Sequence, residues 1–265
     1  RFDCPFVAVP VFDAASALKM VKPLLNPGAS LVSLQNGFTL PLVEKLVGRD
    51  YAIGTMIRMK SRRTPPGQVR TVQRGHLYVG HLHGRTTPQL LAVHGLLNEV
   101  IPTEIIDNIF GGLWSKLTYT CLGMFTSLAD APLRAVLQDE TSGRMCVEFL
   151  GEIIAVGNAL GARFEPLDEY DPRDFDPSHP FAQRLSALHA IARQTRNEDQ
   201  RGGVERFKKG IKTEIDFTVG HVVREGKGAG VDTPICEAVV RFIHEIEAGR
   251  RPLQSRNYAE LAVPA

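Results

Sequence analysis

The feature that most constrains the fold is a change of pattern near residue 102. Before this point, strand-like and helix-like segments alternate, whereas after it apolar residues recur almost entirely at helical spacing. Such alternation predicts a doubly wound α/β sheet, whose ligands bind at the carboxyl ends of the strands. We therefore expect two domains: residues 1–102 with a sheet, and residues 103–265 made of helices.

Short apolar and amphipathic segments follow one another in the first part of the chain. They predict strands at Phe6–Val9, Ser30–Leu34 and Ala52–Ile57, and helices at Asp13–Leu25, Leu40–Val47 and from Thr87-Pro88 onward. Gln68–Gln73 and His76–Val79, joined at Arg74-Gly75, have the turn chemistry of an antiparallel pair that closes the sheet edge. The basic residues Lys60, Arg62 and Arg63 are predicted to form a solvated loop rather than a phosphate site.

Apolar residues at intervals of three and four dominate the second part. They predict helices at Asp107–Asp130, Glu140–Leu160, Ser186–Arg193 and Val204–Arg224, and a last helix from Thr233-Pro234 through Ile246. Asp107 is the expected N-cap of the first of these helices, and Thr233 that of the last. The Pro- and Asp-rich segment Glu165–Pro180 is predicted to be a solvated loop.

Composition argues against several classes of function. The 265 residues carry 31 Lys and Arg against 29 Asp and Glu, a net charge of +2 that gives no reason to expect nucleic acid as a partner. The four cysteines are far apart and form no CxxC or Cys/His group, which favours a reducing compartment over a disulfide framework or structural metal. No apolar run reaches the roughly 18 residues of a membrane span, and no signal peptide is recognised. We expect a soluble cytoplasmic protein without a membrane partner.

Lys116 is the first candidate for chemistry because it lies in the middle of an otherwise apolar helix. Gly111 and Gly112 precede it, although each costs a helix roughly 1 kcal/mol relative to alanine, and close backbone approach explains such glycines. Thr120 follows four residues later, on the same helix face. An ammonium group here can protonate or stabilise an oxygen that becomes an alkoxide. The competing interpretation is a lysine that extends from the helix flank to water.

Two further segments carry candidate residues. Glu214, in KTEIDFTVG, is either a functional carboxylate or a polar-face residue beside the apolar Ile215. Asn36 and Gly37 follow a predicted parallel strand, where an amide and a glycine can approach a flat ring closely. Taken alone, however, an Asn-Gly pair indicates only a turn.

Other motifs give little support to other chemistries. His81 and His83 alternate along a strand end, but we do not expect them to form a zinc site. The sequence contains neither a GxSxG elbow nor a Walker lysine loop, so serine-hydrolase and NTPase functions have no basis in it.

Taken together, these motifs resemble the ketopantoate reductase family, the NADPH-dependent 2-dehydropantoate 2-reductases. The matching motifs run in order along the chain: VAVP followed by Asp13, SLQNG, PPGQV, LWSKL, KTEID with Gly220, AGVDTP, and the terminal Glu247. LWSKL followed by TEID is a fairly specific pair, whereas QNG and PGQV are weak on their own.

The resemblance implies an NADPH-binding Rossmann domain followed by an all-helical domain of the 6-phosphogluconate dehydrogenase C-terminal type, with the active site between them. It implies that NADPH supplies hydride for the reduction of a 2-keto acid, ketopantoate or a related ketone. By position, Lys116 matches the catalytic lysine, Glu214 the acid that binds the substrate hydroxyl, and Asn36 with Gly37 the cofactor side. A homodimer is expected as well.

The sequence also departs from the family pattern. The family's GxGxxG loop, which receives a pyrophosphate at a helix N-terminus, is absent, and the chain opens on what resembles the fourth strand. We therefore expect the sheet domain to lack roughly 60 residues, two βαβ units of about 30 each, and these residues alone to bind NADPH weakly. Pro10 stands where the family usually has a lysine after this strand. At the substrate-binding positions, Thr120 and Met124 replace asparagines and Gly202 replaces a serine, which favours a bulkier or more apolar 2-keto acid.

Two other interpretations remain open. Because the phosphate loop is missing, the chain can be a catalytically inactive fragment that retains the helical domain as a binding or dimerisation unit. Alternatively, it is a related hydroxyacid or opine-type dehydrogenase that uses the same lysine on another substrate. NADPH affinity distinguishes the first alternative from a reductase, and a panel of keto acids distinguishes the second.

Overall fold

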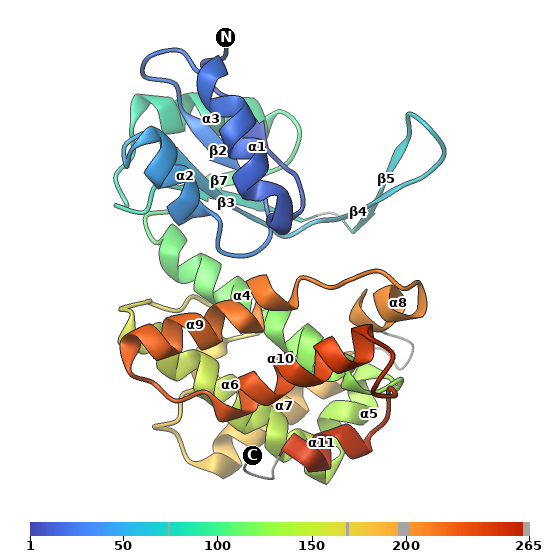
Figure 1. The fold of residues 1–265 in the computed structure, drawn as a ribbon. Coiled ribbons are helices and arrows are strands. Elements are labelled where there is room, and N and C mark those ends of the chain that lie inside the picture. The colour runs from blue at the N-terminus through green and yellow to red at the C-terminus, as the bar shows by residue number, and fades with distance from the viewer. Residues whose placement is uncertain (74, 168–169, 196–201, 262–265) are drawn as a thin grey trace. The chain divides into compact units, whose positions relative to one another are not determined.

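The computed structural model describes residues 1–73, 75–167, 170–195 and 202–261. The chain forms two compact units, Arg1–Leu113 and Trp114–Ala265 (Figure 1). The boundary between these units lies within one helix, α4 (Ile109–Phe125). The domain boundary expected after residue 102 stays a prediction. In the part of the chain that is described, no helix combines the length and the apolar character needed to cross a bilayer.

The first unit is built on a five-stranded mixed sheet with the strand order β1-β2-β3-β6-β7 (Figure 1). Its strands are β1 (Phe6–Val7), β2 (Leu31–Ser33), β3 (Ala52–Ile57), β6 (Leu77–Gly80) and β7 (Thr103–Ile105). The first three strands are parallel, β6 is antiparallel to β3, and β7 is parallel to β6. The predicted parallel strands are thus present, while β7 is a strand in a segment where we expected helices.

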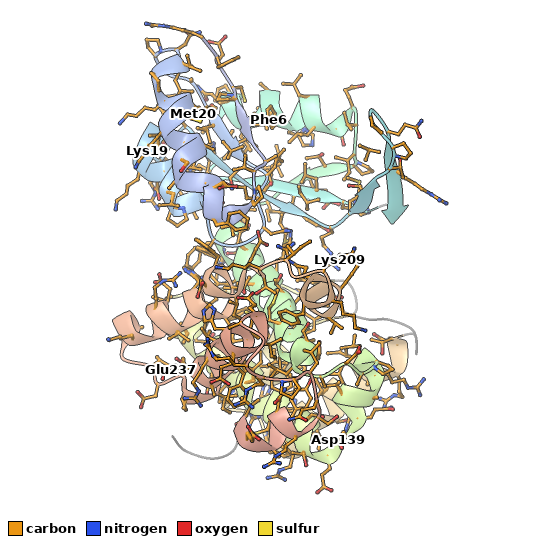
Figure 2. All side chains as sticks on the ribbon, turned by 45° about the vertical axis from the view of Figure 1, so that its right-hand side comes forward. Phe6, Lys19, Met20, Asp139, Lys209 and Glu237 are labelled. Carbon is orange, nitrogen blue, oxygen red and sulfur yellow. The ribbon has the colours of Figure 1, made fainter. Side chains whose placement is uncertain are left out.

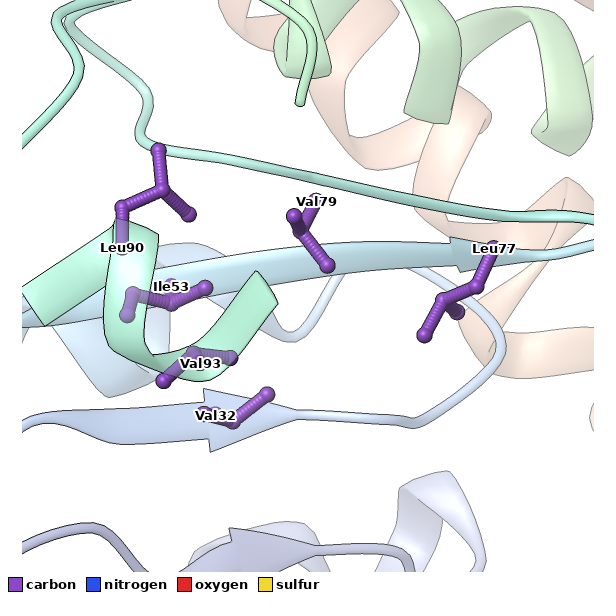
Figure 3. Packing of buried hydrophobic residues seen from close by; sticks show 6 residues of the cluster. All are labelled: Val32, Ile53, Leu77, Val79, Leu90 and Val93. Carbon is purple, nitrogen blue, oxygen red and sulfur yellow. The ribbon is translucent and has the colours of Figure 1, made fainter. Parts of the chain in front are cut away.

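Three of the described helices cover the two faces of this sheet: α1 (Ala14–Val21), α2 (Leu40–Val47) and α3 (Pro88–Asn98). Short 3-10 turns at Val11–Asp13 and Lys22–Leu24 flank α1. On one face, Leu90 and Val93 of α3 pack on Val32, Ile53, Leu77 and Val79 of the strands (Figure 3). Burying each aliphatic side chain of this kind contributes about 1.5–3 kcal/mol.

Gly54 follows Ile53 in β3 and therefore faces the opposite side of the sheet. A Cβ at Gly54 would overlap the side chain of Leu40 and lie 3.2 Å from Cγ1 of Ile109. The glycine thus allows α2 and the first turn of α4 to approach the sheet closely. Lys19 and Met20 lie on the exposed face of α1, which is turned away from the sheet (Figure 2).

A separate hairpin extends from the first unit between β3 and β6 (Figure 1). It consists of β4 (Lys60–Arg63) and β5 (Val69–Gln73), which pair antiparallel. Two predictions are therefore wrong: the basic segment is a strand rather than a loop, and β5 pairs with β4 rather than with β6. The physical reason is that β6 already hydrogen-bonds to β3 on one side and to β7 on the other. Arg74, half of the predicted turn, lies outside the described residues.

The second unit is helical. It contains most of α4 and then α5 (Leu133–Gln138), α6 (Glu140–Ala159), α7 (Phe181–Gln194), α8 (Gly202–Lys208), α9 (Val219–Ala229), α10 (Pro234–Glu247) and α11 (Arg256–Leu261), with 3-10 turns at Thr126–Leu128, Pro172–Phe175 and Ile215–Phe217. The ring of Phe125 lies 5.0 Å from that of Phe149 and 5.1 Å from that of Tyr258, which joins α4, α6 and α11. Asp139 (Figure 2) caps α6 by accepting a hydrogen bond from the Ser142 amide.

The long helix predicted over Val204–Arg224 is instead two helices with an irregular segment between them. Gly210 has a φ of +63°, a left-handed conformation that ends a helix. The Arg206 guanidinium donates hydrogen bonds to the Lys212 carbonyl oxygen and closes the turn. The helical spacing of apolar residues continues past Gly210 although the helix ends there, and the spacing alone therefore predicted one helix instead of two.

Two predicted helix caps are also corrected. The side-chain oxygen of Asn108, rather than Asp107, accepts a hydrogen bond from the Gly111 amide at 3.2 Å and caps α4. Thr233 precedes α10 as predicted, but its side chain makes no capping hydrogen bond. Instead Glu152 of α6 accepts from the Ile235 and Cys236 amides at 2.9 and 2.8 Å. Burial raises the pKa of this carboxyl, while the two amide bonds act in the other direction.

Candidate functional site

Lys116 lies in the middle of α4, in a turn whose neighbouring side chains are buried. Ser115 and Leu117 are 0% and 2% exposed, whereas Lys116 is partly buried. The Ser115 hydroxyl accepts a hydrogen bond from the Glu165 amide at 2.8 Å. Trp114, 1% exposed, packs beside Gly157 of α6. These contacts fix the helical turn from which the Lys116 side chain extends.

Thr120 and Met124 follow Lys116 at intervals of four residues and form one row along α4 with it. Both side chains are partly buried. The Thr120 hydroxyl donates to the Lys116 carbonyl oxygen at 2.9 Å, so its oxygen remains available as an acceptor. This row therefore combines an ammonium, a hydroxyl oxygen and a thioether.

Glu214 lies in the irregular segment between α8 and α9, directly before the 3-10 turn at Ile215–Phe217. Its carbonyl oxygen accepts from the Phe217 amide and from the Thr218 hydroxyl, both at 3.0 Å. The neighbours on either side, Thr213 and Ile215, are 8% and 1% exposed, whereas Glu214 is partly buried. The backbone of Glu214 is thus fixed although no long helix contains it.

An aromatic contact joins α4 to α9. The rings of Trp114 and His221 lie 6.0 Å apart at an angle of 38°. Burial, aided by the nearby Arg224 charge, lowers the pKa of His221 to about 4, so this imidazole is neutral at neutral pH. The helix that carries Lys116 and the helix that follows Glu214 are therefore in contact within the second unit.

Gly202, the third predicted substrate-binding position, is the first residue of α8. Next to it, a Cβ at Gly203 would overlap the hydroxyl of Ser127, which itself donates to the Gly123 carbonyl oxygen at 2.7 Å. Lys208, the last residue of α8, forms an ion pair with Asp130 at 2.8 Å. Both ends of α8 are therefore attached to the chain that follows α4.

Asn36 and Gly37 belong to the first unit and follow β2 at the carboxyl end of the sheet. Asn36 is exposed, and Gly37 has a φ of +81°. Gln35, which precedes Asn36 in the SLQNG motif, is 6% exposed and donates from Nε2 to the Val9 carbonyl oxygen at 2.9 Å. Its Oε1 is buried and accepts no hydrogen bond from the described residues. An exposed amide and a glycine with a positive φ therefore lie at the carboxyl end of a parallel strand, the place where sheets of this kind bind their ligands.

His81 supports the fold. Its Nδ1 lies 2.8 Å from the Ala52 carbonyl oxygen and its Nε2 lies 2.9 Å from the Thr87 hydroxyl, which caps α3. Burial lowers the pKa of His81, and its ring stacks on that of His83 with centroids 4.7 Å apart. Among the residues with described positions, no group of three or more His, Cys, Asp or Glu is arranged to hold a metal ion.

Comparison with known proteins agrees with this architecture. Residues 1–84 match the family model of ketopantoate reductase PanE/ApbA, and residues 108–247 match that of the ketopantoate reductase PanE/ApbA C terminal. A 2-dehydropantoate 2-reductase of Aquifex aeolicus is 24% identical over 249 residues, covering 91% of this chain and 75% of that enzyme.

Solved structures share the fold. A PanE/ApbA family ketopantoate reductase from Ralstonia eutropha superimposes with a TM-score of 0.76 at 23% identity, covering 94% of this chain and 76% of that one. D-mandelate dehydrogenase, in a ternary structure with NADH and anilino(oxo)acetate, has a TM-score of 0.71 at 17% identity and covers 94% and 77%. The predicted α/β sheet followed by an all-helical region is confirmed. The chain belongs to the ketopantoate reductase PanE/ApbA family.

Proposed function

We propose that this protein reduces a 2-keto acid to the corresponding 2-hydroxy acid with NADPH. Family membership supports an oxidoreductase of the ketopantoate reductase type. The observation that carries the proposal is the position of Lys116, a partly buried ammonium between the buried side chains of Ser115 and Leu117. A lysine that served only solubility would not need so rigid a turn, since exposed helix positions hold lysines equally well.

The reaction needs a hydride at the carbonyl carbon and a proton at the carbonyl oxygen. When bound, NADPH supplies the hydride. We assign to Lys116 the transfer of a proton to the oxygen, because a lysine is ordinarily protonated at neutral pH. Glu214 binds a hydroxyl of the substrate, and Asn36 with Gly37 binds the nicotinamide. Each of these roles follows from the position of the residue in the family motifs.

The residues near Lys116 along α4 favour a substrate other than ketopantoate. Met124 offers an adaptable apolar surface in place of an amide, and Gly202 offers no hydroxyl. The Thr120 hydroxyl already donates to the Lys116 carbonyl oxygen, so it offers a substrate an acceptor only. A buried substrate hydroxyl left without its partner costs about 1–3 kcal/mol, and several such losses change preference by powers of ten.

Replacement of Lys116 tests the chemical assignment. We expect Lys116→Ala to lower kcat by about 100-fold or more, the usual effect of losing a general acid. Lys116→Arg is expected to be poor too, because a guanidinium does not give up its proton. Lys227, an exposed lysine on α9, offers a matched control. Steady-state rates for Lys116→Ala and Lys227→Ala that agree within about twofold would remove Lys116 from the mechanism.

A substrate panel tests the specificity. The panel contains ketopantoate, 2-oxoisovalerate and the aromatic acid phenylglyoxylate, each with NADPH and with NADH. We expect an acid more apolar than ketopantoate to have the highest kcat/KM, and NADPH to be preferred. If ketopantoate exceeds the others by about tenfold or more, other residues replace the missing polar contacts. A preference for phenylglyoxylate with NADH would favour a hydroxyacid dehydrogenase, the class to which the fold neighbour D-mandelate dehydrogenase belongs.

The remaining alternative is a binding or dimerisation unit without catalysis. It predicts that no acid of the panel is reduced, whereas the proposed reductase turns over at least one. The cytoplasmic location and the homodimer remain predictions as well, and sedimentation of the purified protein measures its oligomeric state directly.

A further inference from the structure

Glu247 holds the backbone that immediately precedes Glu214. This residue is the last of α10, and its Oε1 accepts from the Thr213 amide at 2.6 Å and from the Thr213 hydroxyl at 2.7 Å. The side chain of Glu247 is 9% exposed and Thr213 is 8% exposed. Hydrogen bonds to an ionised carboxylate are stronger than those between neutral groups, and burial shields them from water. One carboxylate oxygen thus fixes both donors of Thr213.

A second contact from the same helix lies on the other side of Glu214. His244 Nε2 is 2.9 Å from Asp216 Oδ1, and His244 Nδ1 is 3.5 Å from Glu247 Oε2. His244 and Glu247 are three residues apart and share one face of α10. The His244–Asp216 pair is 43% and 56% exposed, so it is weaker than the buried contact of Glu247. The residues on both sides of Glu214 are therefore attached to the C-terminal turn of α10.

We propose that Glu247 is a positioning residue that sets where the Glu214 carboxylate lies, a role that rests on the function proposed above for Glu214. Thr213 and Glu214 share one peptide unit, so the two hydrogen bonds to Glu247 fix the start of the Glu214 backbone. The Phe217 amide and the Thr218 hydroxyl fix its other end. A carboxylate binds a substrate hydroxyl only within hydrogen-bonding distance, so a small displacement of the backbone weakens binding.

The position of Glu247 predicts a particular kinetic effect. If Glu214 binds the substrate equally in the ground state and the transition state, its displacement raises KM for the keto acid and leaves kcat little changed. KM for NADPH is expected to stay unchanged, because the Asn36 turn, to which we assign the nicotinamide, belongs to the first unit, whereas Glu247 and Thr213 belong to the second. Substitution of Lys116, in contrast, lowers kcat.

The opposite end of α10 supplies a matched control. Glu152 also accepts two hydrogen bonds, from the Ile235 and Cys236 amides, and so attaches the N-terminal turn of the same helix. Glu152→Ala therefore removes a carboxylate that also accepts two hydrogen bonds, at the end of α10 opposite to Glu247. A role of Glu247 in stability alone would give both variants the same kinetics.

The test compares Glu247→Ala, Glu247→Gln and Glu152→Ala with ketopantoate as the substrate, because it is the acid of the panel that carries a hydroxyl group for Glu214 to bind. We expect Glu247→Ala to raise KM for the keto acid by about tenfold, with kcat and KM for NADPH within about threefold of the unsubstituted protein. Glu247→Gln, which keeps an acceptor oxygen, recovers most of the affinity. Glu152→Ala lowers the melting temperature and leaves KM unchanged.

Other outcomes overturn the proposal. Equal KM values in Glu247→Ala and the unsubstituted protein show that Glu214 needs no positioning, and equal increases in Glu247→Ala and Glu152→Ala show a general loss of structure. If Glu247→Ala does not fold, Thr213→Val, which removes only the hydroxyl donor, must show a smaller rise in KM of the same kind. A Glu214→Ala variant with unchanged KM refutes the substrate role of Glu214 itself, and absence of turnover with every acid refutes the reductase function.

Discussion

Lys116 and Glu214, the two residues to which we assign chemistry, are held in opposite ways. Lys116 belongs to α4, where continuous helical geometry and buried neighbours determine the direction of its side chain. Glu214 lies where the chain has left α8 and not yet entered α9, and side chains of α10 determine its position. A residue in the first situation depends on packing, whereas one in the second depends on a few hydrogen bonds.

The energies of the two regions differ accordingly. In α4, Trp114 and Leu117 are almost fully buried, and each such apolar side chain contributes about 1.5–3 kcal/mol. In the segment before Glu214, Ile211 is 46% exposed, so little apolar burial holds it. There, hydrogen bonds to the charged Glu247, worth about 1.5–3 kcal/mol each, are the main contribution. Three changes probe this difference.

The largest expected effect is that of acid on the contact between His221 and Trp114. The pKa of His221 is lowered to about 4, from 6.5 in an exposed histidine. The unfolded chain therefore binds more protons between these pH values, and stability from this group is complete above pH 6.5 and lost as pH falls toward 4. The difference corresponds to about 3 kcal/mol, less any attraction of the protonated ring to Glu225, 3.8 Å away.

Urea unfolding between pH 8 and pH 4.5 measures this loss. Glu152 also titrates in acid, but its raised pKa acts in the opposite direction, because such a group favours folding at low pH. We therefore compare the protein with His221→Gln, in which every other group is the same. The unsubstituted protein should lose more unfolding free energy than His221→Gln as the pH is lowered from 8 to 4.5. Parallel pH profiles would show that His221 is not buried against α4 as described.

A smaller effect is expected from crowding the turn before Lys116. A Cβ at Gly157 would overlap the ring of Phe164 and lie 3.3 Å from Cε3 of Trp114. Overpacking costs about 1–3 kcal/mol, against a gain of at most about 1 kcal/mol for alanine in a helix. We expect Gly157→Ala to lose about 1–2 kcal/mol of unfolding free energy. Gly95→Ala, at an exposed and open position of α3, should gain about 0.5–1 kcal/mol, and a gain in both variants would contradict packing as the constraint on α4.

Local sequence signals predicted those elements whose ends are set by their own residues. The helix Leu40–Val47 and the strand Ala52–Ile57 have the predicted bounds. Thr87 caps α3 by accepting from the Leu90 amide at 3.1 Å, three residues along the chain. Lys116 was recognised for a similar reason, because a charge among apolar residues of one helix is visible in the sequence alone.

The predictions failed where a residue distant in sequence decides the outcome. The partner of β5 depends on which edges of β6 are free, and the cap of α10 comes from Glu152 on another helix. Glu247 was noted only as part of a motif, because its partner Thr213 is 34 positions away and neither residue is unusual in its own segment. Gln35 was noted only within the SLQNG motif, because its hydrogen bond to the Val9 carbonyl oxygen joins segments that are 26 positions apart.

An effect no larger than that of Gly157→Ala is expected at the break that separates α8 from the Glu214 segment. Gly210 has a φ of +63° and open space around its Cα, so an added methyl group meets no neighbouring atom but strains the backbone. A residue with a Cβ in this conformation costs roughly 1–2 kcal/mol. Gly228, an exposed glycine inside α9 with equally open space, should instead gain about 0.5–1 kcal/mol when replaced by alanine. Chemical denaturation of Gly210→Ala and Gly228→Ala should therefore give changes of opposite sign.

Because Gly210 precedes Thr213 by only three residues, its replacement should also raise KM for the keto acid slightly, whereas that of Gly228 should not. Equal gains in stability would mean that the chain tolerates a continuous helix here, and Glu214 would then owe its position to helical geometry, as Lys116 does.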